Sequence, residues 1–201
     1  STRYAEPYVY EDLQEILLPL IKGRYEWLPY NYTLAYRNAT EGLPLVRPVG
    51  MYSADPARYS DIDDEYLWGR DLLVAPVMRQ GATSRPVTLP DGVWVDYNNP
   101  AKVFRGDTTI IAEAPLEVLP LYVRGGALIP KAKYEMKNTL GYHTDNYTIE
   151  YYPTEECGKS ECTIFEDDLS SARSLEKGEY ALLTVSADNT DAGITLRAAC
   201  E

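Results

Sequence analysis

Apolar residues in the range 11–38 recur at steps of three and four: Leu13, Ile16, Leu17, Leu20, Ile21, Trp27, Leu28 and Leu34. This spacing is the period of an amphipathic α-helix. Pro19 and Pro29 fall inside the pattern, and a proline removes a backbone donor and clashes with the preceding turn. We therefore expect either one bent helix or two helices broken near Gly23. Gly42 is the type of residue on which such a helix ends.

The apolar face of this helix is too large to be covered by the residues that follow. Residues 43–52 form a short apolar run that predicts a buried strand, although Pro48 limits its pairing. Residues 61–69 predict a brief helix, because they begin with acidic capping residues and end at Gly69. Helix, strand and helix in this order are typical of the closing unit of a βα-barrel, although this order alone is weak support.

From residue 71 onward the apolar runs are short, and turn-forming residues separate them at intervals of about ten residues. We expect strands at 71–76, 85–89, 93–97, 102–104, 108–112, 119–130, 147–152, 163–165, 180–186 and 194–198. Gly125 and Gly126 are expected to form a turn between two strands within 119–130, and the polar run 131–145 reads as a linker. This spacing is typical of antiparallel β-sandwiches. The last block is small for a sandwich, so we expect its domain to continue beyond Glu201.

Composition describes a globular and acidic chain. Its 201 residues are 45% hydrophobic and 25% charged, and 19 basic residues against 31 acidic ones give a net charge of −12. Such a chain repels phosphate backbones and anionic lipid, so we expect neither nucleic acid nor a membrane as partner. No apolar run approaches the roughly 20 residues that span a bilayer. Residues 1–10 lack the pattern of a secretory signal, so we expect the chain to begin as a mature protein or a fragment.

Cysteine and histidine are too few for a metal or disulfide scaffold. Cys157 and Cys162 could bridge a hairpin in an oxidising compartment, which would leave Cys200 unpaired; the sequence does not decide whether they are bridged. His143 is the single histidine and receives no role. We expect no metal and no cofactor. The eighteen tyrosines are interpreted as sheet packing in preference to a sugar-binding surface.

Seven ordered blocks of sequence carry a specific resemblance. They are EPY (6–8), RYEWLPYNYT (24–33), GLPLVRP (42–48), DDEYLWGRDLLVAPV (63–77), LPDGVWVD (89–96), APLEVLPLYVRGG (114–126) and FEDD (165–168). In this order and spacing they resemble the C-terminal third of the glycoside hydrolases of family 31, the α-glucosidase and α-xylosidase family. The resemblance covers nearly the whole chain.

The resemblance implies a mainly β fold with proximal and distal antiparallel β-sandwich domains, preceded by the last helix and strand of a (β/α)₈ barrel. Residues 1–52 would be the end of the barrel, 53–132 the proximal sandwich and 133–201 the distal sandwich. The partner would be the N-terminal catalytic barrel of the same polypeptide, which would cover the apolar helix face. If the chain is isolated, we expect an oligomer or a flexible N-terminal segment.

Family members cleave terminal α-linked sugars with retention of configuration, using one Asp as nucleophile and another as acid/base. The resemblance places these residues in Trp-x-Asp-Met and Gly-Asp-Asn motifs, and neither motif occurs here. The expected function is structural support of an α-glycosidase, with an α-glucosidase favoured, and no catalytic residue within this chain. Which α-glycoside is used, and whether water or a sugar accepts it, are left open. A non-catalytic carbohydrate-binding or structural β-sandwich protein is the alternative, and a hydrolase with an unrecognised carboxylate pair is a weaker one.

Two acidic groups and one arginine are local candidates. The acidic residues Asp61, Asp63, Asp64 and Glu65 are interpreted as helix capping in preference to a Ca²⁺ site, because a calcium loop also needs a glycine and a terminal Glu. The run 166–168 is interpreted as a turn in preference to an edge metal site. Arg47 is expected to be buried and paired with a carboxylate, since an unpaired buried charge is costly.

The other candidates are aromatic residues and possible glycosylation sites. Met51 and Tyr52 could line a sugar pocket at a barrel strand end, although packing is favoured. Core packing is also favoured for Trp68 and Trp94 over stacking on sugars. The Asn-x-Thr triplets are interpreted as incidental; they begin at Asn31, Asn38 and Asn146. Residues 28–33 resemble those of secreted bacterial members, which favours a periplasmic or extracellular location over a cytoplasmic one.

Overall fold

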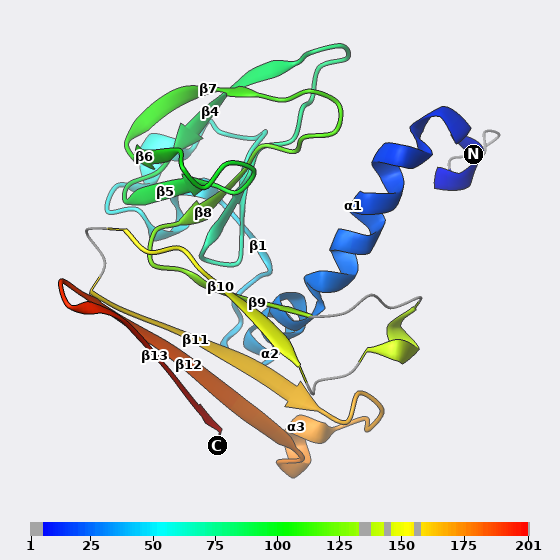
Figure 1. Cartoon of the computed structure of the whole chain (residues 1–201), viewed down its shortest axis with the longest axis vertical. Coiled ribbons are helices and arrows are strands. Elements are labelled where there is room, and N and C mark those ends of the chain that lie inside the picture. The colour runs from blue at the N-terminus through cyan, green and yellow to red at the C-terminus, as the bar shows by residue number, and fades with distance from the viewer. Residues whose placement is uncertain (1–5, 133–137, 143–145, 155–157, 201) are drawn as a thin grey trace.

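The computed structural model describes residues 6–132, 138–142, 146–154 and 158–200. A helical segment leads into a proximal group of strands, and a distal group follows (Figure 1). The strands are paired antiparallel throughout the described sheets. The mainly β, antiparallel fold class expected from the sequence is therefore confirmed.

Two α-helices account for the first periodic segment, α1 (Gln14–Glu26) and α2 (Leu28–Glu41), after short 3₁₀ turns at Pro7–Val9 and Glu11–Leu13. The break falls at Trp27, four residues after the expected position near Gly23. Pro29 explains this position, because a proline needs no backbone donor in the first turn of a helix and so starts α2 there. Gly42 ends α2 in the left-handed conformation, with φ of +72°, as expected.

The proximal sandwich has a six-stranded sheet in the order β1-β2-β3-β8-β5-β6 and a two-stranded sheet of β4 and β7. Its strands are β1 (Val46–Arg47), β2 (Tyr66–Trp68), β3 (Leu72–Val74), β4 (Ser84–Leu89), β5 (Val93–Asp96), β6 (Val103–Arg105), β7 (Thr108–Glu113) and β8 (Leu121–Arg124). One hydrophobic core includes residues of both sheets, among them Trp94 and Leu89, both fully buried. Core packing of Trp94 is thus confirmed.

The brief helix expected at 61–69 is absent from the structure, and this expectation was wrong. Residues Tyr66–Trp68 form strand β2, and a 3₁₀ turn occupies Pro56–Tyr59 instead. Leu67 is completely buried in the sheet, so tertiary pairing overrides the local helix signals. Gly69 does not end a helix; it forms the turn between β2 and β3 with φ of +68°.

Of the strand expected at 43–52, only β1 forms, and a 3₁₀ turn follows it at Val49–Tyr52. β1 pairs antiparallel with β2, with Val46 opposite Trp68. The eighth strand of a βα-barrel would pair in parallel with its neighbours. The antiparallel pairing therefore makes this segment part of the proximal sheet.

Gly125 and Gly126 form a turn, but the strands on either side of it do not pair with each other. β8 pairs with β3 and β5, whereas β9 (Leu128–Ala132) pairs with β10 (Tyr147–Tyr151). The Gly125 N–H donates to the Val93 carbonyl in the proximal group, and the Gly126 N–H donates to the Tyr152 carbonyl in the distal group. The expected turn is therefore confirmed, and the two glycines are a crossing point between the groups.

The distal group sets the β9–β10 pair beside a three-stranded sheet of β11, β12 and β13. These strands run Lys159–Asp167, Tyr180–Thr190 and Gly193–Cys200, with a short helix α3 (Ser174–Lys177) between the first two. Of the expected linker 131–145, residues 131–132 belong to β9 and Thr139–Gly141 form a 3₁₀ turn; 133–137 and 143–145 lie outside the described residues.

Candidate functional site

Helix α2 forms hydrogen bonds with strands of both the proximal and the distal group. The Tyr30 hydroxyl donates to the Trp68 carbonyl at 2.7 Å, which connects α2 to the proximal sheet. Thr33 Oγ1 accepts a hydrogen bond from the Phe165 N–H at 3.0 Å, and the Tyr32 hydroxyl donates to Asp167 Oδ1 at 2.6 Å; both connect α2 to β11. The helix therefore forms one body with the strands.

An aromatic cluster with one buried cation completes this junction. The ring centroids of Trp27 and Trp68 lie 4.8 Å apart, and Tyr97 packs on Trp27 at 5.7 Å. The Lys131 ammonium lies 4.5 Å from the Trp27 ring centroid and pairs with Glu150 at 2.9 Å. Packing of Trp68 at this junction confirms the favoured interpretation. The role of Lys131 was missed, because its segment was interpreted as a linker and nothing local marks it as buried.

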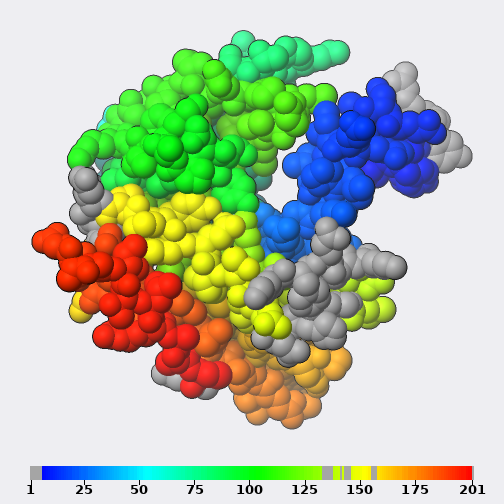
Figure 2. Space-filling model, viewed as in Figure 1, coloured from blue at the N-terminus to red at the C-terminus, as the bar shows by residue number. Residues whose placement is uncertain are grey.

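Helix α1 differs, since none of its residues is buried. Leu18, Leu20 and Ile21 are 54%, 50% and 40% exposed, and we call these three residues the α1 apolar surface. Figure 2 shows α1, in blue, standing apart from the green proximal strands with a hollow between them. Leu18 and Leu20 are two positions apart and point to different sides of the helix, so apolar side chains are exposed around α1 and not along one stripe. A group of exposed apolar side chains on one element marks an interaction surface. The chain thus presents an apolar helix that its own strands leave uncovered.

Arg47 is buried, as expected, but no carboxylate of the described residues forms the expected ion pair with it. Its side chain donates from Nε to the Pro44 carbonyl at 2.7 Å and from Nη1 to the Tyr52 hydroxyl. No ion pair of Arg47 with a carboxylate exists among the described residues, and Nη2 has no hydrogen-bond partner there. The Tyr52 ring lies between Arg47 and Arg70, 5.5 Å and 5.9 Å from its centroid.

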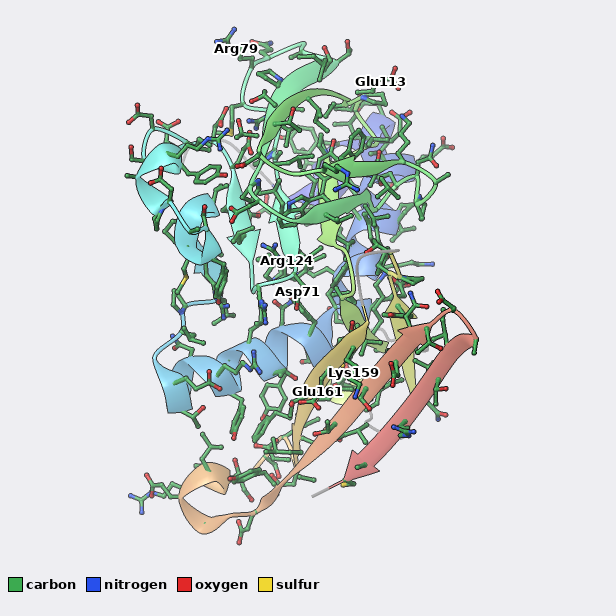
Figure 3. All side chains as sticks on the ribbon, turned by 90° about the vertical axis from the view of Figure 1, so that its left-hand side faces the viewer. Asp71, Arg79, Glu113, Arg124, Lys159 and Glu161 are labelled. Atoms are coloured by element: carbon green, nitrogen blue, oxygen red, sulfur yellow. The ribbon has the colours of Figure 1, made fainter. Side chains whose placement is uncertain are left out.

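Met51 and Tyr52 are 37% and 39% exposed and therefore lie on the surface. They belong to the 3₁₀ turn that follows β1. Nearby, Asp71 lies close to Arg124 (Figure 3). Burial raises the pKa of Asp71, and the charges of surrounding arginines, with Arg70 and Arg124 foremost, oppose this rise. This cluster is a charged junction and shows no pair of carboxylates facing one sugar.

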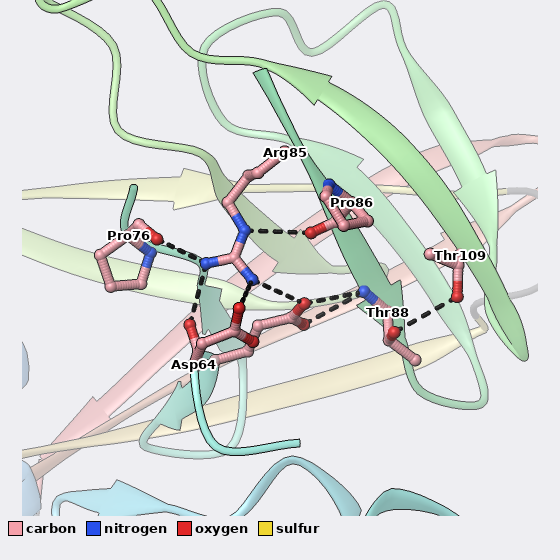
Figure 4. A network of polar contacts seen from close by, with 7 residues as sticks. Asp64, Pro76, Arg85, Pro86, Thr88 and Thr109 are labelled. Carbon is pink, nitrogen blue, oxygen red and sulfur yellow. Dashed lines mark hydrogen bonds and ion pairs between the residues drawn. The ribbon is translucent and has the colours of Figure 1, made fainter. Parts of the chain in front are cut away.

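Two residues of the acidic group at 61–65, Asp64 and Glu65, form ion pairs with the buried Arg85. The Arg85 Nη2 atom lies 2.8 Å from Asp64 Oδ2 and 3.2 Å from Glu65 Oε1, and the Thr88 N–H donates to both Glu65 oxygens (Figure 4). Nε of Arg85 donates to the Pro86 carbonyl, and Nη1 donates to the carbonyls of Asp64 and Pro76. The helix-capping interpretation of these acids was wrong, because no helix exists there to cap. A signal was available: Arg85 occupies an inward position of an alternating strand.

Burial raises the pKa of Glu65 from 4.5 to about 7, although the Thr88 N–H and Arg85 oppose this rise. The folded state then binds a proton more tightly than the unfolded chain, so stability is lost as the pH rises from about 4.5 through about 7. Between these two pH values we expect the free energy of unfolding of the wild type to fall by on the order of 1 kcal/mol relative to that of Glu65→Gln, whose side chain cannot titrate. Urea unfolding at several pH values measures it. Asp63→Asn, an exposed neighbour, should leave the slope of the wild type unchanged, and equal slopes in wild type and Glu65→Gln would contradict the prediction.

The run 166–168 ends strand β11 at Asp167 and leads into the loop between β11 and α3, where its aspartates bind nearby backbone donors as expected. Asp167 accepts hydrogen bonds from the Leu169 N–H and the Ser174 hydroxyl, and Asp168 accepts from the N–H groups of Ser170 and Ser171. The Ser171 hydroxyl, followed by the N–H groups of Ser171 and Ser170, lowers the pKa of Asp168. The described residues contain no group of three or more His, Cys, Asp or Glu that could hold a metal ion.

The remaining candidates are the asparagines of the Asn-x-Thr triplets, His143 and the cysteines. The Asn31 side chain accepts from the Trp68 indole at 2.8 Å, and the Asn38 amide donates to the Leu43 carbonyl at 3.2 Å. His143 and Cys157 lie outside the described residues, and Cys162 carries a free thiol whose pKa burial raises to about 12. Among the helices that can be described, none has the length and apolar character required to cross a membrane.

Known proteins share this architecture and sequence. Residues 42–129 match the model of the glycosyl hydrolase family 31 C-terminal domain. Alpha-glucosidase 2 of Bacillus thermoamyloliquefaciens is 32% identical over 179 residues, which are 89% of this chain and 22% of that protein. An alpha-xylosidase of Saccharolobus solfataricus is 29% identical over 186 residues, which are 92% of this chain and 25% of that protein. A dextranase structure from Flavobacterium johnsoniae superposes with a TM-score of 0.86 at 28% identity, covering 98% of this chain and 24% of that one.

These relatives are glycoside hydrolases, and the part they share with this chain is a C-terminal β region. The chain belongs to glycoside hydrolase family 31 and corresponds to its C-terminal region. It spans a quarter or less of the length of the relatives that it matches.

Proposed function

We propose that this chain is the C-terminal part of a retaining family 31 α-glycosidase, an α-glucosidase in preference to an α-xylosidase, and that it acts as structural support. The observation that carries the proposal is the exposure of the α1 apolar surface to solvent. Helix α2, in contrast, is hydrogen-bonded to strands of both groups. An independent β-sandwich has no use for such a helix. A catalytic (β/α)₈ barrel preceding this chain in the same polypeptide would cover it.

The proposed division of the chain follows the pairing of β1. Helices α1 and α2 would close the barrel, and the proximal sandwich would begin after Gly42, because β1 belongs to the proximal sheet. The match of the C-terminal domain model begins at the same residue. The distal sandwich would begin after the Gly125–Gly126 crossing point, with β9, instead of at about residue 133 as the sequence predicts. The substrate, a terminal α-linked sugar, would be held by the barrel.

Activity assays test the proposal directly. The 201-residue chain should show no turnover of a chromogenic α-glucoside, because the Trp-x-Asp-Met and Gly-Asp-Asn motifs are absent from its sequence. The complete polypeptide should hydrolyse the same substrate and release the α-anomer first, as a retaining enzyme does. Turnover by the isolated chain, or inversion by the complete polypeptide, would refute the assignment.

A periplasmic or extracellular location is also proposed, on the resemblance of residues 28–33 to secreted bacterial members. Fractionation of the producing cells tests it, with the complete polypeptide detected by an antibody against this chain. Recovery from the cytoplasmic fraction alone would contradict the proposal.

A further inference from the structure

A groove opens on the proximal sandwich between the β5–β6 turn, strand β7 and the loop that leads into β8. Its volume is 330 Å³, which lies at the small end of the range found for ligand pockets. Phe104 and Ile110 contribute apolar surface, and Tyr122 lies among them, with its ring 6.0 Å from that of Phe104. Glu113 lines the groove as well, at the end of the proximal strands that is farther from α2 (Figure 3).

Tyr122 is only 3% exposed, and its hydroxyl forms no hydrogen bond with another described residue. The hydroxyl oxygen is not one of the enclosed polar atoms that lack a partner, so it opens toward the groove, where a ligand can reach it. Burial, together with the charges of Asp96 and Glu65, raises the pKa of Tyr122 to about 12, so the group stays a neutral hydroxyl. It can therefore both donate to and accept from a ligand in the groove.

The rim supplies further polar groups that the fold does not use. Asp96 Oδ1 accepts from the N–H groups of Asn98 and Asn99, but no internal hydrogen bond to its second oxygen exists within the described chain. The side chains of Asn99 and Glu113 likewise form no hydrogen bond with another described residue. Two carboxylates against the single cation of Lys102 give the groove a net negative charge, which disfavours an anionic ligand.

We propose that this groove binds one or two hexose units of a neutral α-linked glucan. An apolar floor suits the carbon-bound face of a sugar ring. The tyrosine hydroxyl, a free amide and two carboxylates suit its hydroxyl groups, since together they offer donors and acceptors. The inference rests on the proposed function, which makes an α-glucan the available neutral sugar. It adds a binding site within the C-terminal region itself.

The test is a titration of the complete polypeptide with maltotriose and isomaltotriose, followed by NMR, while an imino sugar saturates the active site. We expect saturable binding with a dissociation constant of about 1–10 mM and shifted signals of Phe104 and Ile110. Tyr122→Phe combined with Asn99→Ala should weaken binding at least about tenfold, because two hydrogen bonds are lost. Glu117→Gln, an exposed carboxylate outside the groove, is the matched control and should bind like the wild type.

Three results would overturn the inference: no saturable binding up to about 20 mM, equal binding by the double variant, or shifts confined to residues outside the groove. The Asn99→Ala variant alone tests the rim without touching the core, so failure of Tyr122→Phe to fold does not decide the outcome. The activity of the same polypeptide separates the two kinds of failure. If the polypeptide hydrolyses its substrate but does not bind the oligosaccharide outside the active site, this groove is rejected and the proposed α-glycosidase function stands. If it neither hydrolyses nor binds, both proposals are rejected.

Discussion

Replacing Leu18, Leu20 and Ile21 with glutamine should damage the complete enzyme far more than the isolated chain. About half of each side chain is open to solvent here, so its substitution leaves the stability of the chain itself within about 0.5 kcal/mol. In the complete enzyme a barrel would cover the remaining apolar area, at about 1 kcal/mol for each residue and roughly 3 kcal/mol in all. We expect a melting temperature lowered by several degrees and a corresponding loss of active enzyme.

The two measurements are urea unfolding of the isolated chain and thermal unfolding, with activity, of the complete enzyme. The triple variant should also reduce any self-association of the isolated chain in sedimentation experiments, because the α1 apolar surface would drive it. Glu15→Gln, an exposed polar change on the same helix, is the control and should leave both preparations unchanged. An unaltered complete enzyme would show that nothing covers this surface and would remove the main support for the proposed role.

The sequence predicted the elements whose signals are local. The helical period over 11–38, the glycine stop at Gly42 and the short β segments all depend on neighbouring residues, and the structure confirms them. Pairing was harder to predict. Whether the strands beside Gly125 and Gly126 join each other or separate sheets is decided by distant partners such as Val93 and Tyr152.

Buried polar residues were predicted only in part. Burial of Arg47 follows from its apolar neighbours, but its hydrogen bonds to the Pro44 carbonyl and Tyr52 hydroxyl depend on the turns around it. The acidic run at 61–65 carried strong capping signals, and these were misleading, because β2 gains more from pairing in the sheet than a single helical turn gains from its caps. The acids instead hold Arg85, some twenty residues away.

We expect the largest loss of stability from Gly69→Ala, at the junction between α2 and the proximal sheet. A Cβ at this position would lie 2.3 Å from the Tyr30 hydroxyl oxygen and 3.0 Å from a Leu34 methyl carbon. The Tyr30 phenol cannot easily move away, because its hydroxyl donates to the Trp68 carbonyl and its ring is buried against Trp68. The φ of +68° adds the cost of a left-handed residue. Lost hydrogen bond, overpacking and backbone strain together should cost about 3–5 kcal/mol in urea unfolding.

Gly81→Ala separates the contact from the backbone strain. Gly81 has nearly the same φ, +74°, but nothing lies within 4 Å of its Cβ position, so this variant should lose only about 1 kcal/mol. Adding Tyr30→Phe to Gly69→Ala removes the closest atom and should recover part of the loss, whereas Tyr30→Phe alone should be destabilising. Equal costs for the two glycine variants would show that the Tyr30 contact is not a constraint. Helix α1 joins α2 at Trp27, so the position of α2 against the proximal sheet also sets the direction of the α1 apolar surface. We therefore expect Gly69→Ala to lower the stability of the complete enzyme as well.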